Sequence, residues 1–159
     1  MSASIRPEAQ AQTRAMSPAD VYAVAEVEKS SYQFPWSIGI FRDCLLAGYH
    51  SQVLEVSGVV SGYSIMSVAG TEAHLLNICV HPSCQRLGYG RQLLNSVLLR
   101  ADELGVEQVF LEVRPSNDIA IALYESVGFK LVGTHLSYYQ AVDGRQDAVI
   151  YAVSISSIH

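Results

Sequence analysis

The most constraining feature of the sequence is a strand, a glycine turn and a helix in immediate succession between residues 75 and 105. An apolar run from Leu75 to Val80 has the composition of a buried strand, and a turn containing Gly88 and Gly90 follows it after a short polar link. Gly105 stands where a helix-terminating glycine is expected. Between them, apolar residues recur at a period of about 3.6 and indicate an amphipathic helix: Leu93, Leu94, Val97, Leu98, Ala101 and Leu104.

The glycine turn predicts an anion site at the start of this helix. Neither Gly88 nor Gly90 has a Cβ, so the backbone can approach a ligand closely. The N–H groups of the first helical turn lack partners within the helix, and the helix dipole favours negative charge beside them. The segment therefore predicts a phosphate-binding turn, although a tight connection without a ligand gives the same pattern.

A second strand and helix follow. The apolar strand from Val109 to Arg114 contains one carboxylate, Glu112, and Ser116-Asn117 begins a helix that ends at Gly128. The apolar face of that helix includes Ala120, Leu123 and Val127, and Tyr124 is expected beside this face. Taken alone, Glu112 could pair with Arg114 or face water, and a tyrosine beside an apolar stripe usually belongs to the core.

These segments together resemble the GNAT acetyltransferase superfamily. Gln85-Arg86-Leu87-Gly88-Tyr89-Gly90 matches its Q/R-x-x-G-x-G/A acyl-CoA signature. Leu111-Glu112-Val113-Arg114-Pro115-Ser116-Asn117, followed by Ala122-Leu123-Tyr124-Glu125-Ser126-Val127-Gly128-Phe129, is similar to the branch of bacterial ribosomal-protein-alanine N-acetyltransferases. The same branch is also similar at Phe34-Pro35-Trp36-Ser37 and, near the C-terminus, at Tyr138-Tyr139 with Asp147-Ala148-Val149. The resemblance therefore covers roughly Ser17 to Val153.

Periodicity and turn residues predict an α/β chain. Strands are expected at residues 11–15, 52–56, 59–68, 72–80, 109–113, 129–138 and 145–153. Helices are expected after Ser17-Pro18, at 38–46, at 90–104 and after Asn117. The resemblance implies the GNAT fold, a mixed, mostly antiparallel sheet with helices on both faces and with parallel fourth and fifth strands that splay apart. Residues 1–10 are expected to be loose and residues 11–159 to form a single N-acetyltransferase domain.

The resemblance also implies that acetyl-CoA is the acetyl donor and indicates where it binds. Backbone groups of Ile78, Cys79 and Val80 would follow the pantetheine arm, and Asn117 would contact it, unless that residue is only a helix N-cap. Six residues in and just after the signature would surround the pyrophosphate: Arg86, Leu87, Gly88, Tyr89, Gly90 and Arg91. Backbone contacts are expected before either arginine side chain, since Arg86 and Arg91 could equally be surface charges.

Acetyl transfer to an amine poses two proton problems. An ammonium group is not nucleophilic, so a base is needed, and the thiolate of CoA leaves more readily when it is protonated. Glu112 matches the base of the family, acting directly or through a water, and Tyr124 matches its acid. An α-amino group, with a pKa near ~8, is about a tenth neutral at pH 7, against less than about a thousandth of a lysine near ~10.4. One ordinary base therefore suits a protein N-terminus better.

The resemblance implies that the acceptor is the N-terminal alanine of a basic ribosomal protein, bS18 of the small subunit. Two other interpretations stay open at this point. The chain could acetylate a lysine side chain or a small-molecule amine, or it could be an acyl-CoA-binding module without catalysis. Intact Glu112 and Tyr124 speak against the module.

Composition narrows the remaining function classes. A net charge of −5 argues against direct nucleic-acid binding and permits attraction to a basic peptide. No apolar run approaches the ~20 residues of a membrane span, and the N-terminus lacks a signal-like apolar centre, so a cytoplasmic protein with no membrane partner is expected. Cys79, His81 and Cys84 lack a fourth ligand and a standard zinc spacing, so no metal is expected. Cys79 is expected to be a small buried strand residue.

Overall fold

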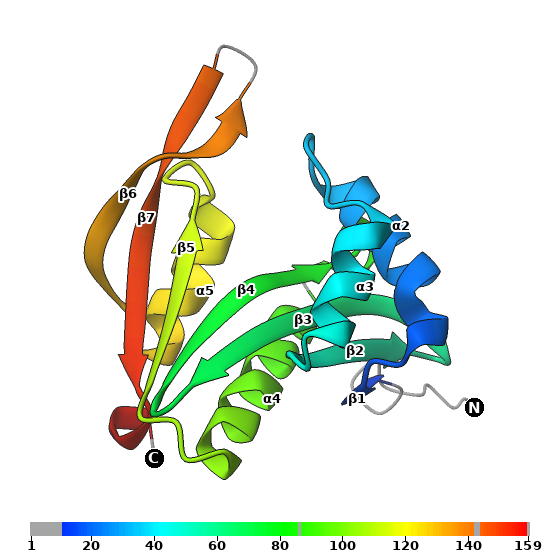
Figure 1. Cartoon of the computed structure of the whole chain (residues 1–159), viewed down its shortest axis with the longest axis horizontal. Coiled ribbons are helices and arrows are strands. Elements are labelled where there is room, and N and C mark those ends of the chain that lie inside the picture. Colours follow the sequence, from blue (N-terminus) through cyan, green and yellow to red (C-terminus); the bar gives the residue numbers. More distant parts are fainter. Residues whose placement is uncertain (1–10, 86, 142–143, 159) are drawn as a thin grey trace. The chain divides into compact units, whose positions relative to one another are not determined.

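Figure 1 shows the elements of the chain in a computed structural model, which describes residues 11–85, 87–141 and 144–158. The strands are β1 (Ala11–Ala15), β2 (His50–Val56), β3 (Val59–Ala69), β4 (Glu72–Val80), β5 (Gln108–Val113), β6 (Lys130–Ala141) and β7 (Gly144–Ser154). The α-helices are α2 (Val21–Ser31), α3 (Ile38–Leu46), α4 (Tyr89–Glu103) and α5 (Asp118–Val127). Short 3-10 turns are η1 (Pro18–Asp20), η2 (Pro82–Cys84) and η3 (Ile155–Ile158). Each predicted strand and helix is confirmed within a few residues, while the expectation for residues 1–10 lies outside the described part.

The strands form one seven-stranded mixed sheet in the order β1-β2-β3-β4-β5-β7-β6. Strands β4 and β5 are parallel, as predicted, because the chain crosses between them through α4. Their paired register runs from Glu72↔Gln108 to Leu75↔Leu111, while β4 continues to Val80 and β5 to Val113. Strand β7 lies between β5 and β6 and is antiparallel to both, an order that the sequence analysis had not assigned.

The described chain divides into two compact units, which we treat separately. The first unit comprises residues up to 66 and residues 77–97, and the second comprises residues 67–76 and 98 onward. In the first unit, side-chain alternation along β2 separates two apolar clusters. Val53 belongs to a cluster with α2 and α3, whereas its neighbour Leu54 packs with Tyr89 and Leu93 of α4. Helices therefore cover both faces of this part of the sheet, as Figure 1 shows.

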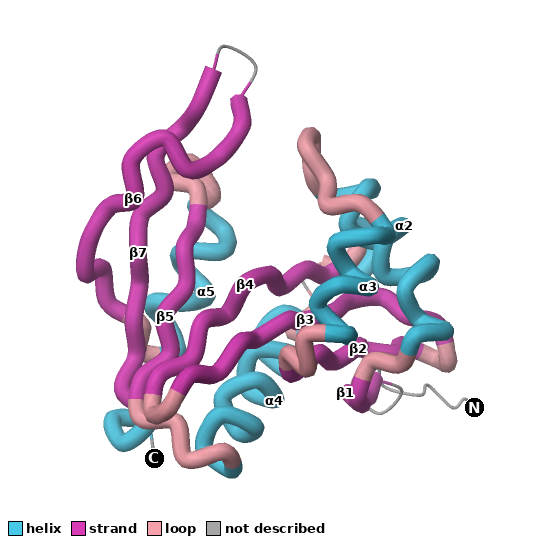
Figure 2. Tube along the Cα trace, in the orientation of Figure 1, coloured by secondary structure: helices cyan, strands magenta, loops and turns pink. Residues whose placement is uncertain are grey.

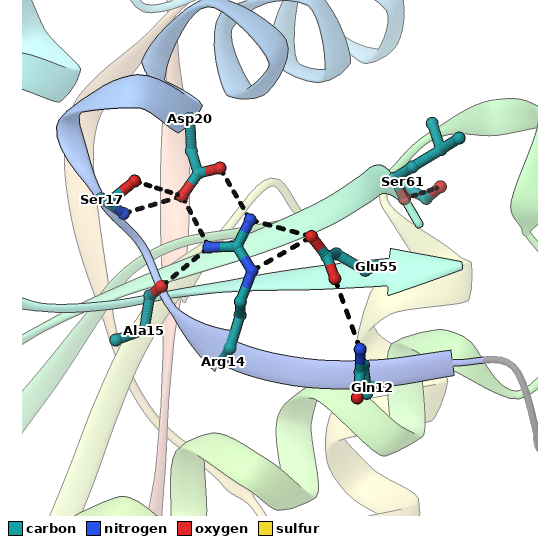
Figure 3. Close-up of polar contacts among 8 residues, drawn as sticks. Gln12, Arg14, Ala15, Ser17, Asp20, Glu55 and Ser61 are labelled. Carbon is teal, nitrogen blue, oxygen red and sulfur yellow. Dashed lines mark hydrogen bonds and ion pairs between the residues drawn. The ribbon is translucent and has the colours of Figure 1, made fainter. Parts of the chain in front are cut away.

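A partly exposed ion-pair cluster joins β1 and η1 to β2 (Figure 3). The Arg14 guanidinium donates to both carboxylate oxygens of Asp20 at 2.8 Å and to Glu55 at 2.9 and 3.1 Å. Asp20 also accepts the Ser17 N–H at 2.7 Å. The hydrogen bonds from Arg14 lower the pKa of Asp20 from 3.8 to about 2, with Ser17 assisting and burial opposing the change. This cluster fixes β1 and η1 against β2.

In the second unit, β6 and β7 form the long hairpin seen in Figure 2. The pairing is irregular between His135↔Ala148 and Tyr139↔Gln146, where three residues of β6 oppose one of β7. Ser137, inside this bulge, has a φ of +54°, and its N–H donates to the Asp147 carboxylate at 2.8 Å. The bulge gives β6 a fixed bend rather than a continuous ladder.

Helix α5 is capped as the sequence predicted. The Asn117 side chain accepts the Ala120 N–H at 3.2 Å, and Gly128 ends the helix in a left-handed conformation. Burial along the helix differs from the expectation. Tyr124, placed beside the apolar face by its sequence pattern, is the buried residue of α5, whereas Leu123 and Val127 are half-buried.

Candidate active site

Glu112 is surrounded by polar side chains that come from two strands of the second unit, β4 and β6. Its side chain lies near the carboxyl end of β5 and is 15% exposed. The carboxylate oxygen Oε1 lies 3.5 Å from Nε2 of His74 on β4. The other oxygen, Oε2, lies 3.4 Å from Nδ1 of His135 on β6. Each carboxylate oxygen therefore faces an imidazole nitrogen, and both histidine side chains are about half exposed, at 48% and 50%.

The parallel register between β4 and β5 places His74 beside Glu112. His74 pairs with Phe110, which precedes Glu112 by two residues and so shares its face of the sheet. The imidazole stacks on the Phe110 ring, with centroids 5.8 Å apart and planes 28° apart. The imidazole therefore packs on Phe110 while its Nε2 faces the Glu112 carboxylate.

His135 reaches Glu112 across β7. Ile150 of β7 pairs with Glu112 on one side and with Gly133 on the other, and Gly133 precedes His135 by two residues. His135 therefore lies on the same face of the sheet as Glu112. Neither histidine stands out in the sequence, because the approach of His74 and His135 to Glu112 depends on the position of β7 and on the strand registers.

Two tyrosines of β6 complete the surroundings of Glu112. The Tyr139 hydroxyl donates to the backbone carbonyl of Glu112 at 2.9 Å, and the Arg114 guanidinium lies 4.4 Å from the centre of the Tyr139 ring. Burial raises the pKa of Tyr139, with further contributions from Tyr138, Glu112 and Tyr124, while Arg114 opposes them. Burial also raises the pKa of Tyr138, and the charge of Glu112 and a hydrogen bond with it add to the effect. Both phenols are therefore protonated donors at neutral pH.

Tyr124 is the buried residue of α5. Its ring is buried and packs against Phe129, with ring centroids 5.7 Å apart. The second unit thus contains both sequence-predicted catalytic residues, with Glu112 beside Tyr139 and Tyr124 packed against Phe129.

The predicted phosphate-binding turn lies in the first unit. Gly88 has a φ of +83°, a conformation that favours glycine, and an added Cβ there would meet no atom within 4 Å. Helix α4 begins directly after it, and the Gln92 N–H donates to the Gly88 carbonyl at 3.1 Å. The open space beside a helix start fits an anion.

The side chains of the turn differ in their surroundings. Tyr89 is buried against Leu54 and Leu93, so only its backbone is left for a ligand. Leu87 and Arg91 are exposed, and Gly90 is half-buried in the first turn of α4. The prediction for Arg86 lies outside the described residues.

The backbone of β4 preceding the turn already has partners in the first unit. The Ile78 carbonyl accepts the Tyr32 hydroxyl at 3.3 Å, and the Val80 carbonyl accepts Nε2 of Gln85 at 3.1 Å. A carbonyl has two lone pairs, so each can still accept a second hydrogen bond. Cys79 is buried and burial raises the pKa of its thiol, which confirms a packing role and disfavours a nucleophilic one.

A pocket of about 640 Å³ lies at the opposite end of β5 from Glu112, in the second unit. Its lining comes from the starts of β4 and β5, the end of α4 and the end of β7, and includes Glu72, Asp102 and Glu107. None of the sequence-predicted site residues lines it. Within residues 11–85, 87–141 and 144–158, no group of His, Cys, Asp and Glu side chains could hold a metal ion.

Comparison with known proteins gives consistent matches. A model of the acetyltransferase (GNAT) family matches residues 18–129. The [ribosomal protein bS18]-alanine N-acetyltransferase of Escherichia coli (strain K12) is 40% identical over 137 residues, which cover 86% of this chain and 93% of the relative.

Solved structures agree with the sequence matches. The crystal structure of the ribosomal-protein-S18-alanine N-acetyltransferase from Escherichia coli superposes with a TM-score of 0.85 at 37% identity, covering 91% of this chain and 94% of that one. The structure of yncA from Salmonella typhimurium, with its cofactor acetyl-CoA, superposes with a TM-score of 0.76 at 21% identity, covering 92% and 94% of the two chains. The second likeness concerns the fold alone.

Proposed function

Because the chain belongs to the acetyltransferase (GNAT) family and is an N-acetyltransferase, we propose that it acetylates the N-terminal alanine of ribosomal protein bS18. The observation that carries this proposal is the 40% identity over 86% of the chain to the Escherichia coli enzyme named for that reaction. We also propose that residues 11–159 act as a single N-acetyltransferase domain, since the matched family segment contains residues of both compact units.

The acetyl donor in this proposal is acetyl-CoA, bound at the turn before α4. The open side of Gly88 and the positive end of the α4 dipole favour the pyrophosphate. The backbone of Ile78, Cys79 and Val80 would accompany the pantetheine arm. The same proposal includes contacts to acetyl-CoA from Asn117, from Arg91 and from four further signature residues: Arg86, Leu87, Tyr89 and Gly90.

Glu112 is the proposed general base and Tyr124 the proposed general acid. Glu112 takes one proton from the acceptor ammonium, directly or through a water, and the neutral amine attacks the thioester carbonyl. As the C–N bond forms and the C–S bond breaks, Tyr124 gives its proton to the leaving sulfur and receives the second proton lost by the nitrogen. The products are the acetylated amine and CoA thiol, and one proton remains to be released. The placement of Glu112 near the carboxyl end of β5 and the match of Tyr124 to the acid of the family support these assignments.

The setting proposed for this reaction is the cytoplasm, where ribosomal proteins are made. No helix in the described part of the chain is long and apolar enough to cross a membrane. The net charge of −5 favours encounter with a basic peptide rather than with nucleic acid. This attraction should weaken as salt rises, because salt screens exposed charges.

A panel of peptides tests the proposed acceptor. Peptides with the N-terminal sequence of bS18 would carry alanine or other residues at position one, and spermidine would represent small amines. Steady-state kinetics should give the highest kcat/KM with alanine first. Equal rates for all first residues, or faster acetylation of spermidine, would contradict the bS18 assignment.

A further inference from the structure

The carboxylate proposed as the base has an imidazole nitrogen at each of its two oxygens. His74 Nε2 lies 3.5 Å from Oε1 of Glu112, and His135 Nδ1 lies 3.4 Å from Oε2. Because both rings are about half exposed, each can exchange protons with water. Glu112 itself is 15% exposed and is less open to water than either partner.

A carboxylate alone is a poor final site for a proton taken from an ammonium group. An α-ammonium ordinarily has a pKa near ~8 and a glutamic acid near ~4.3, so the transfer is unfavourable by roughly 10⁴. An imidazole ordinarily titrates near ~6.5, which reduces the mismatch to roughly 10¹–10². General-base catalysis is also most efficient when the base titrates near the working pH.

We propose that the proton taken by Glu112 comes to rest on His74 or His135, so that the base of this enzyme is the His74–Glu112–His135 cluster. The ammonium gives one proton to the carboxylate and becomes a neutral amine. The carboxylic acid then gives that proton to the facing imidazole nitrogen, in the tautomer that carries no hydrogen there. Glu112 returns to a carboxylate beside an imidazolium, and the half-exposed ring releases the proton to water after transfer. The inference rests on the proposed role of Glu112.

The titratable and charged groups around the cluster leave the two histidines as the proton acceptors next to Glu112. Partial burial raises the pKa of Tyr138 and of Tyr139 on β6, so neither phenol exchanges its proton at neutral pH. Of the charged residues nearby, Arg114 lies over the Tyr139 ring and donates to Gln146 of β7, while Asp147 accepts the Ser137 N–H. On β4, His74 stacks on the uncharged Phe110 ring.

The histidines act through Glu112, so they are positioning residues, and glutamine is the informative replacement. A glutamine can hydrogen-bond to a carboxylate but cannot take up a proton near pH 7. In His74→Gln/His135→Gln, kcat with the alanine peptide should fall at least about tenfold at pH 7, while KM for acetyl-CoA changes less than about twofold. Each single variant should lose less, because the other imidazole remains. His50→Gln, on β2 of the first unit, is the control and should keep kcat within about twofold.

The pH–rate profile distinguishes proton uptake from simple support of Glu112. The wild-type kcat should decline on the acidic side near pH 6–7, where histidines ordinarily become charged. In the double variant this inflection should disappear or move toward the glutamate range, and added imidazole should restore part of the rate. In a Glu112→Gln background, the two histidine replacements should lower kcat by no more than about twofold further.

An unchanged kcat and acidic limb in the double variant would overturn the inference. So would a tenfold loss that imidazole does not rescue and that multiplies fully with Glu112→Gln. The proposed function fails differently, since it is contradicted when Glu112→Gln alone retains wild-type turnover or when no alanine peptide is acetylated.

Discussion

Glu112 and Tyr124 act at opposite ends of one transition state in the proposed reaction, so replacing each should leave a different pH signature. Glu112→Gln keeps the shape but loses the base, and kcat at neutral pH should fall by about 10²–10⁴. Part of that rate should return at high pH, where the amine deprotonates in solution. Tyr124→Phe should also slow turnover, but raising the pH should not rescue it.

The measurement is a pH–rate profile for each variant, with CoA affinity determined separately by calorimetry. The double variant need not show the product of the two losses, because both residues serve one step. Near wild-type turnover of Glu112→Gln at neutral pH would remove this carboxylate from the mechanism.

Single residues also show where sequence reasoning ends. Glu112 was singled out because it is the one carboxylate in an apolar strand beside a family motif, and its role as the base stays a prediction. His74 and His135 could not be singled out, because neither stands in a motif and both reach Glu112 only through strand pairing. Asn117 was predicted with two compatible roles, and the structure confirms its role as an N-cap.

At the scale of elements, the turn between β4 and α4 can be tested by one matched pair of variants. Gly88 and Gly58 have nearly the same φ, +83° and +80°, and an added Cβ meets nothing within 4 Å at either. Gly88→Val and Gly58→Val should therefore carry a similar backbone strain. Only Gly88→Val should also weaken CoA binding, by tenfold or more in calorimetry, because its side chain fills the space beside the helix start. Equal CoA affinities in the two folded variants would place the pyrophosphate elsewhere.

The cluster that joins β1 and η1 to β2 predicts a pH-dependent stability. The pKa of Asp20 is about 2 in the folded chain against 3.8 ordinarily, so between these values the unfolded chain binds more protons. The contribution of Asp20 to the free energy of unfolding should therefore be fully present above about pH 4 and be lost as pH falls toward 2. We expect a loss of about 1–2 kcal/mol, because the Arg14 side chain is partly exposed and water screens the ion pair. Urea unfolding of wild type and Asp20→Asn between pH 5 and 2 should show a shallower decline in the variant. Parallel declines would mean that other carboxylates dominate.

Most elements could be predicted because their signals are local. Ser37 before an apolar-periodic run and Gly105 after one mark helix ends whatever the rest of the chain does. The insertion of β7 between β5 and β6 and the bulge around Ser137 were not predicted, because both arise from long-range pairing. That same pairing produces the surroundings of Glu112.

At the scale of the whole molecule, the account rests on which amine receives the acetyl group. The family alone permits a protein α-amine, a lysine side chain or a small amine, and the resemblance to enzymes named for bS18 alanine favours the first. An α-amine is also the easier acceptor, since about a tenth of it is neutral at pH 7.

The most direct test is to locate the acetyl group in one peptide that carries both kinds of amine. The peptide would have the bS18 N-terminal sequence with a free α-amine on alanine and at least one internal lysine. After incubation with acetyl-CoA and the purified chain, tandem mass spectrometry should find a single acetyl group on the alanine nitrogen, and a peptide with a blocked α-amine should stay unmodified. Acetylation of the lysine at a comparable rate, or no transfer to either amine, would contradict the account.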